Sequence, residues 1–187
     1  MAAHPLLMAL NATIYNFAVE LADADRHVYE SVSLKVARHP SESDEYLVTR
    51  VLAYLLELTE GIEFSRGLSD VEAPAIAVRN LSHTVTTWID IGTPDAQRLH
   101  KAAKTGARVV VYTHKDPTLF LKQLAGERIH RGEALELYAI DRALIRELVA
   151  RLERRVRFSL SVAECELYVS IGAETLTGPI VRLHRPE

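Results

Sequence analysis

Hydrophobic residues alternate with polar ones in some stretches of the chain and recur at every third or fourth position in others, which predicts a mixture of strands and helices. Residues 9–22 and 28–38 are rich in Val, Ile, Thr and Tyr, and the polar segment DADRH between them predicts a long hairpin. Leucines and valines then follow at helical spacing. This spacing predicts an amphipathic helix over residues 42–58, with Ser41 as its N-cap.

Residues 84–112 form the central unit, and their pattern predicts a strand, a tight loop, a helix and a second strand. Thr93 is the predicted cap of the helix, with Pro94 in its first turn, and Gly106 is expected to end it. The second strand, 109–112, is a continuous apolar run of the kind found in buried parallel strands.

The remaining pattern predicts a short strand over 62–66, a turn of helix at 75–78, a helix over 116–124, a strand over 135–140, a helix capped by Asp141, and antiparallel strands at 157–162, 166–171 and 175–183. This order predicts an α/β (α+β mixed) fold, in which a central mixed β-sheet is flanked by helices on both faces. We expect one domain over 1–187, with 1–7 as an N-terminal extension outside the core.

Composition narrows the functional classes. A net charge of -3 gives no overall attraction to nucleic acid, so phosphate binding needs a local basic patch or a metal. The single cysteine, Cys165, excludes an internal disulfide and fits a reducing compartment. The sequence contains no signal-peptide pattern and no apolar run long enough to span a membrane, so we expect a cytoplasmic protein without membrane contact.

Acidic residues from separate predicted elements are the candidates for chemistry. Asp90 stands at the end of the first central strand, where open α/β sheets bind their ligands. Glu72 lies in a loop with Asp70, and Glu45 lies in the first helix. Carboxylates suit Mg²⁺, which also binds water and substrate phosphate. Lys101 on the next helix is positioned to orient water or phosphate, and the predicted activity is therefore phosphodiester hydrolysis.

Each candidate also has a simpler structural interpretation. Asp90 at a strand end is about as often a loop cap, Glu45 on a helix is more often solvated, and Glu72 in a polar loop is an ordinary turn residue. Arg98 shares a helix face with Lys101, which predicts a small basic stripe beside Asp90. The histidines show no metal-ligand spacing, and no phosphate-cradling glycine loop is present.

Several segments together resemble a known family. ALNATIYNFAVELADADRHVYESVSLKVARHPSES, EFSRGLS and WIDIGTPDAQRLHKAAKTGARVVVYTH, with the signatures ARHPSE and WIDIG-x-PD, are similar to the YaeQ family of bacterial proteins, and the similarity runs from Met8 to the last strands. The resemblance implies a variant of the PD-(D/E)XK restriction-endonuclease-like fold, whose core is a helix, an antiparallel hairpin and a strand–helix–strand unit. It carries no established reaction.

The nuclease motif maps onto this sequence with departures. Asp90 resembles the acid of the metal-binding strand, but Gly92 stands where the motif lysine belongs. Lys101, or alternatively Arg98, would replace that lysine. Glu72 would serve as the acid before the hairpin proline, and Glu45 resembles the acid of the first helix.

Two hypotheses remain open on this basis. The first is a Mg²⁺-dependent nuclease or phosphodiesterase, in which Glu72 and Asp90 hold the metal, Glu45 assists, Lys101 positions water, and Arg98 contacts substrate phosphate. The second is a catalytically inactive binding module that kept the fold and acts through a protein or nucleic-acid partner. Gly92 and Ala73 favour the second, because each replaces a motif residue.

Overall fold

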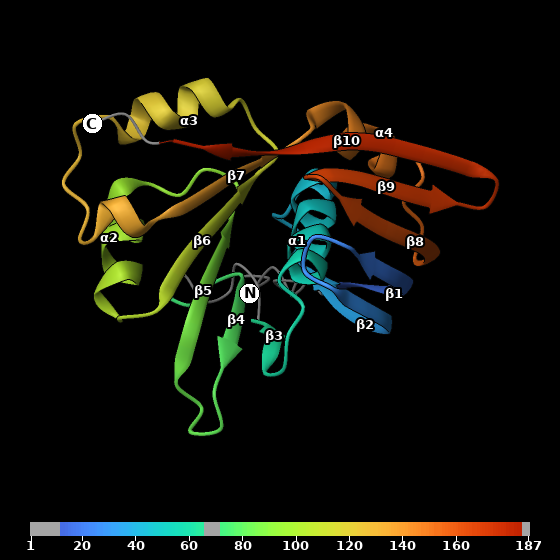
Figure 1. The fold of residues 1–187 in the computed structure, drawn as a ribbon, viewed down its shortest axis with the longest axis horizontal. Coiled ribbons are helices and arrows are strands. Elements are labelled where there is room, and N and C mark those ends of the chain that lie inside the picture. The colour runs from blue at the N-terminus through green and yellow to red at the C-terminus, as the bar shows by residue number, and fades with distance from the viewer. Residues whose placement is uncertain (1–11, 66–71, 185–187) are drawn as a thin grey trace, which may run out of the picture.

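The computed structural model describes residues 12–65 and 72–184 (Figure 1). Within them lie four α-helices, a short 3₁₀ turn and ten strands. The helices are α1 Asp44–Leu56, α2 Ala96–Lys104, α3 Pro117–Leu124 and α4 Arg142–Val149, and the turn is Gly132–Ala134. The strands are β1 Thr13–Asp23, β2 Val28–Arg38, β3 Ile62–Phe64, β4 Ile76–Arg79, β5 Val85–Ile91, β6 Arg108–Thr113, β7 Glu136–Ile140, β8 Arg155–Ala163, β9 Glu166–Ile171 and β10 Glu174–Leu183.

All ten strands belong to one mixed sheet, in the order β2-β1-β8-β9-β10-β7-β6-β5-β4-β3. Strand β10 joins the two halves, because its first part pairs with β9 and its second part with β7 (Figure 1). The pairs β1–β8, β5–β6 and β6–β7 are parallel, and the others are antiparallel. The predicted mixed sheet with flanking helices is confirmed.

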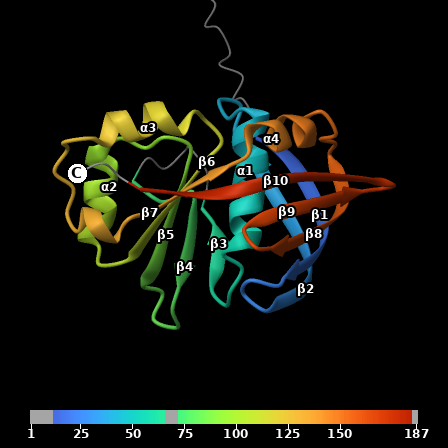
Figure 2. The ribbon, with the colours of Figure 1, turned by 45° about the horizontal axis from the view of Figure 1, so that its top comes forward.

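Helix α1 lies between the two halves of the sheet (Figure 2). It packs on β5 and β6 of one half and on α4, and its apolar side chains join those of β1 and β8 in one core. Leu47, Leu52 and Leu55 are almost completely buried there, which is the burial that stabilises an amphipathic helix. Helix α2 packs on the other face of β6, in a second core with Trp88 and Leu99. The two ends of α1 therefore open between the sheet halves, and both have a cleft.

The structure corrects three local predictions. Ser43, not Ser41, caps α1, because its side chain accepts a hydrogen bond from the backbone N–H of Tyr46 at 3.1 Å. Asp95, not Thr93, caps α2, because its carboxylate accepts from the N–H of Arg98 at 2.8 Å. A carboxylate is a strong N-cap, and it stands directly after Pro94 here.

The third correction concerns residues 75–78, for which a turn of helix was predicted. They belong largely to β4, which pairs antiparallel with both β3 and β5. The segment IAVR is too short to show a periodicity, and its two flanking strands decide its conformation. None of the described helices combines the length and the hydrophobicity needed to cross a membrane.

Candidate functional site

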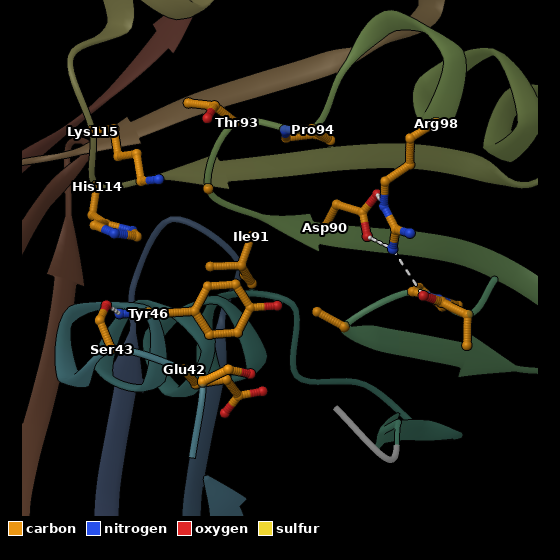
Figure 3. A pocket seen from close by; sticks show the side chains of 15 residues that line it. Glu42, Ser43, Tyr46, Asp90, Ile91, Thr93, Pro94, Arg98, His114 and Lys115 are labelled. Atoms are coloured by element: carbon orange, nitrogen blue, oxygen red, sulfur yellow. Dashed lines mark hydrogen bonds and ion pairs between the residues drawn. The ribbon is translucent and has the colours of Figure 1, made fainter. Parts of the chain in front are cut away.

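A cleft of about 490 Å³ lies where the N-terminal end of α1 faces the carboxyl end of β5 (Figure 3). The segment before α1 contributes Ser41, Glu42 and Ser43, and α1 itself contributes Tyr46. Residues 73–75, residues 90–94, Arg98 of α2, and His114 with Lys115 after β6 complete the lining. Asp90 is in this cleft, at the sheet end where the sequence predicted a site.

Asp90 is bound on both carboxylate oxygens by Arg98 (Figure 3). Arg98 Nε donates to Oδ2 and Nη2 donates to Oδ1, each at 2.7 Å, and Nη2 also donates to the Ala73 carbonyl at 2.8 Å. The Asp90 side chain is 3% exposed and that of Arg98 is 30% exposed. The hydrogen bonds from Arg98 to Asp90 raise the pKa of the guanidinium above its ordinary value. The negative charge of Asp90 is therefore compensated inside the protein.

Glu42 is a second acid of the cleft, and it is compensated in the same way. Arg50 Nη1 and Nη2 donate to its two carboxylate oxygens at 3.3 Å each, and both side chains are almost completely buried. Arg50 Nη2 also donates to the Ala37 carbonyl at 2.7 Å. Sequence reasoning missed this pair. The signal was Arg50 itself, a charged residue between Leu47 and Val51 in the buried stripe of α1.

Tyr46 lies between these two ion pairs and points its hydroxyl into the cleft (Figure 3). Burial raises the pKa of this hydroxyl to about 12, with smaller opposing effects of Arg50 and Glu42. The group therefore stays protonated at neutral pH, and it is able to donate a hydrogen bond to an anionic acceptor.

His114 and Lys115 form the side of the cleft that follows β6. Burial, and next the charge of Lys115, lower the pKa of the His114 imidazole below its ordinary value of 6.5. Its Nδ1 atom is buried and has no hydrogen-bond partner among the described residues. Lys115 is exposed and forms no ion pair within the described part of the chain. Because both acids are paired with arginines, Lys115 gives the cleft a positive balance.

The structure separates the other predicted site residues from Asp90's carboxylate. Glu72 and Lys101 form an exposed ion pair at 3.5 Å and line a smaller neighbouring hollow of about 230 Å³, together with Arg98. Glu45 is not among the residues that line the cleft. Its pKa is lowered mainly by a hydrogen bond within its own residue and one with Ser43, and less by the charges of His114 and Arg146. Asp70 lies outside the described residues.

The donor set does not fit a magnesium ion as these residues are arranged. Among residues 12–65 and 72–184, no three His, Cys, Asp or Glu side chains are grouped so that they could hold a metal. Both oxygens of Asp90 already accept hydrogen bonds from a cation. Mg²⁺ remains a prediction, and we derive no reaction step through it.

Gly92 explains why the strand has no lysine at the motif position. Its φ is 89°, a left-handed conformation that glycine adopts far more easily than lysine does. Its N–H donates to the Tyr112 carbonyl at 2.9 Å, which holds the chain against β6 as it leaves β5. A lysine here would need a different backbone turn. Arg98, one of the two predicted replacements for that lysine, is the cation that contacts Asp90.

The fold and the cleft together define a mixed α/β protein with a polar, ion-paired site between its half-sheets. The chain belongs to the YaeQ family, because the model of that family, described as YaeQ protein, matches residues 8–179. It is similar to the uncharacterized protein YaeQ of Escherichia coli K12, with 41% identity over 107 residues, and to that of Salmonella typhi, with 38% identity over the same length. Each match spans 57% of this chain and 59% of the relative.

Two solved structures are similar over nearly their whole length. The YaeQ protein from Pseudomonas syringae superposes with a TM-score of 0.83 and 28% identity, covering 92% of this chain and 96% of that one. The YaeQ protein from Xanthomonas axonopodis pv. citri gives a TM-score of 0.83 and 30% identity, covering 94% of this chain and 99% of that one. The predicted family membership is confirmed.

Proposed function

We propose that this chain is a binding protein on a nuclease-like fold, which holds the phosphate groups of nucleic acid in the cleft beside Asp90 without hydrolysing them. The arrangement of α1, β3, β4, β5, α2 and β6 supports the nuclease-like part. In that order, a helix is followed by antiparallel pairs β3–β4 and β4–β5, and then by the parallel pair β5–β6 across α2. This is the core that the resemblance to PD-(D/E)XK proteins implies.

The pair of hydrogen bonds between Arg98 and Asp90 carries the proposal. In a metal-dependent nuclease, the acid at this strand position must offer its oxygens to the cation. Here an arginine holds both oxygens at 2.7 Å. A bidentate arginine–carboxylate pair is among the stronger hydrogen-bonded pairs, so it favours a structural role for Asp90 over a metal-binding one.

The chemistry of the cleft supports an anionic ligand. Lys115 supplies an unpaired positive charge within the described residues, and Tyr46 and the serine hydroxyls supply neutral donors. The N-terminal end of α1 also faces the cleft, and helix N-termini favour negative charge. Phosphate groups meet all three requirements. Net charge of the whole chain is negative, so the attraction is confined to this patch.

Fluorescence anisotropy with labelled single- and double-stranded oligonucleotides in EDTA tests the proposal. We expect binding that weakens with added salt, because phosphate contacts release counterions. Lys115→Ala should weaken binding and reduce the salt slope by about 1. Lys122→Ala, which removes an exposed lysine of α3 away from the cleft lining, is the matched control and should bind as the parent does.

Two results would overturn the proposal. If no oligonucleotide binds in EDTA at low salt, the cleft does not recognise phosphate. If Mg²⁺ or Mn²⁺ produces cleavage that Asp90→Ala abolishes, the hydrolytic hypothesis is right and Asp90 must leave Arg98 to bind the metal.

A further inference from the structure

A second cleft, of about 580 Å³, lies at the opposite, C-terminal end of α1. The turns after β1 and β8 contribute Asp25 and Cys165, the end of α1 contributes Glu57, and β6 and β10 contribute Arg108 and Arg182. None of these residues lines the cleft beside Asp90. Its volume lies in the range of small-molecule sites.

Carboxylates outnumber cations around this cleft. Arg108 lies between two of them, donating to Glu57 from Nη1 at 2.7 Å and to Glu136 from Nε at 2.7 Å. Asp23 and Asp25 add two more carboxylates, whereas Arg26 and Arg182 are the other guanidinium groups of the lining. Four acids therefore surround three arginines, which leaves a negative balance.

Asp23 shows that one of these acids lacks a full set of partners. It is 1% exposed, and its Oδ1 accepts the Arg26 N–H at 3.0 Å. Its Oδ2 has no hydrogen-bond partner among the described residues, because Arg26 Nη1 stays 3.8 Å away. The Arg26 guanidinium instead donates to the carbonyls of Leu56 and Leu58. A buried carboxylate oxygen without a donor is costly, and an added donor would relieve that cost.

The end of α1 strengthens the negative potential. The carbonyl end of a helix carries partial negative charge, and basic residues commonly occupy the last turn. The last turn of α1 contains none, and its C-cap is the acid Glu57. Two stacked rings, Tyr112 and Tyr138, with centroids 5.3 Å apart, provide an apolar wall beside these acids.

We propose that this second cleft binds a small ligand with a protonated amino group, which lies against the tyrosine wall and donates hydrogen bonds toward Asp23 and the end of α1. Acidic groups with aromatic rings are the combination that recognises amines, through charge and through the ring face. The two ends of α1 then carry sites of opposite preference, an anionic ligand at the N-terminal end and a cationic one at the C-terminal end.

Isothermal titration of the full chain with putrescine, a small diamine, tests this site. We expect saturable binding to the parent, and no comparable binding of sodium acetate. Asp23→Asn keeps the shape of the side chain but removes its charge, and it should weaken putrescine binding by about tenfold or more. Lys115→Ala lies in the other cleft and should leave putrescine binding unchanged.

Circular dichroism decides whether Asp23→Asn has kept its fold. If it has not, Thr87→Phe, which places a ring in the cleft from β5, takes its place and should also abolish binding. The proposal is overturned if putrescine does not saturate the parent, if a folded Asp23→Asn or Thr87→Phe binds it as the parent does, or if acetate binds as well. None of these results depends on whether the cleft beside Asp90 binds nucleic acid.

Discussion

Arg98 Nε and Nη2 each lie 2.7 Å from an oxygen of Asp90, so a side chain of α2 is fixed to the end of β5 by two parallel hydrogen bonds. Nη2 also reaches the carbonyl of Ala73, in the segment that leads into β4. One guanidinium therefore joins three segments of the chain. The acid that the sequence marks as a candidate metal ligand is, in this arrangement, the anchor of that junction.

Removing Asp90 should destabilise the protein. Asp90→Ala leaves a half-buried guanidinium without its carboxylate, and we expect a loss of about 1–3 kcal/mol in the free energy of unfolding. Glu63→Ala is the matched control, because Glu63 pairs with Arg79 on the surface, where such pairs contribute less than about 1 kcal/mol. Urea unfolding measures both. Equal losses for the two variants would mean that the Asp90–Arg98 pair adds no more than a surface pair does.

The sequence identified Asp90 because a strand-end acid can be found from strand pattern alone. It named Arg98 only as a substitute for Lys101, because both stand on one face of α2 and the pattern cannot tell which side chain turns toward β5. The choice depends on how α2 packs on the sheet. In the structure Arg98 lies 5.7 Å above the Trp88 ring, and Lys101 lies with Glu72 near the surface.

The fold shows the same division between local and distant signals. The hairpin of β1 and β2 and the unit β5–α2–β6 follow from neighbouring residues, and both were predicted. The parallel pairing of β1 with β8 was not, because it joins residues 16–23 to residues 155–162. No local pattern specifies such a partner, and the same is true of the passage of β10 from one half-sheet to the other.

Arg50 should be more important for stability than any surface charge. Arg50→Met leaves the buried Glu42 carboxylate without its cation, and we expect a loss of about 3–5 kcal/mol. The double variant Glu42→Gln with Arg50→Met removes both charges and should recover part of this loss. A double-mutant cycle by urea unfolding measures the coupling. A double variant as unstable as the sum of the two single variants would contradict the pairing.

Gly178 should not tolerate a side chain. A Cβ built on it would lie 2.8 Å from the Cβ of Asp141 and 2.9 Å from that of Leu144, so β10 and the start of α4 would have to move apart. We expect Gly178→Ala to cost about 1–3 kcal/mol by overpacking. Thr177→Ala, at the exposed neighbouring position, should change stability by less than about 0.5 kcal/mol. Thermal unfolding compares the two, and an unchanged Gly178→Ala would show that this contact can open freely.

His114 should make the stability of the protein depend on pH. Burial, and then the charges of Lys115 and Arg142, lower the pKa of its imidazole in the folded state, whereas Glu45 opposes them. The unfolded chain therefore binds a proton more readily below the ordinary value of 6.5, and the free energy of unfolding falls as the pH drops from 6.5 toward the folded pKa. Urea unfolding at a series of pH values measures the slope. His114→Asn should flatten it, and Lys115→Ala should flatten it in part. A slope that survives in His114→Asn would assign the dependence to another group.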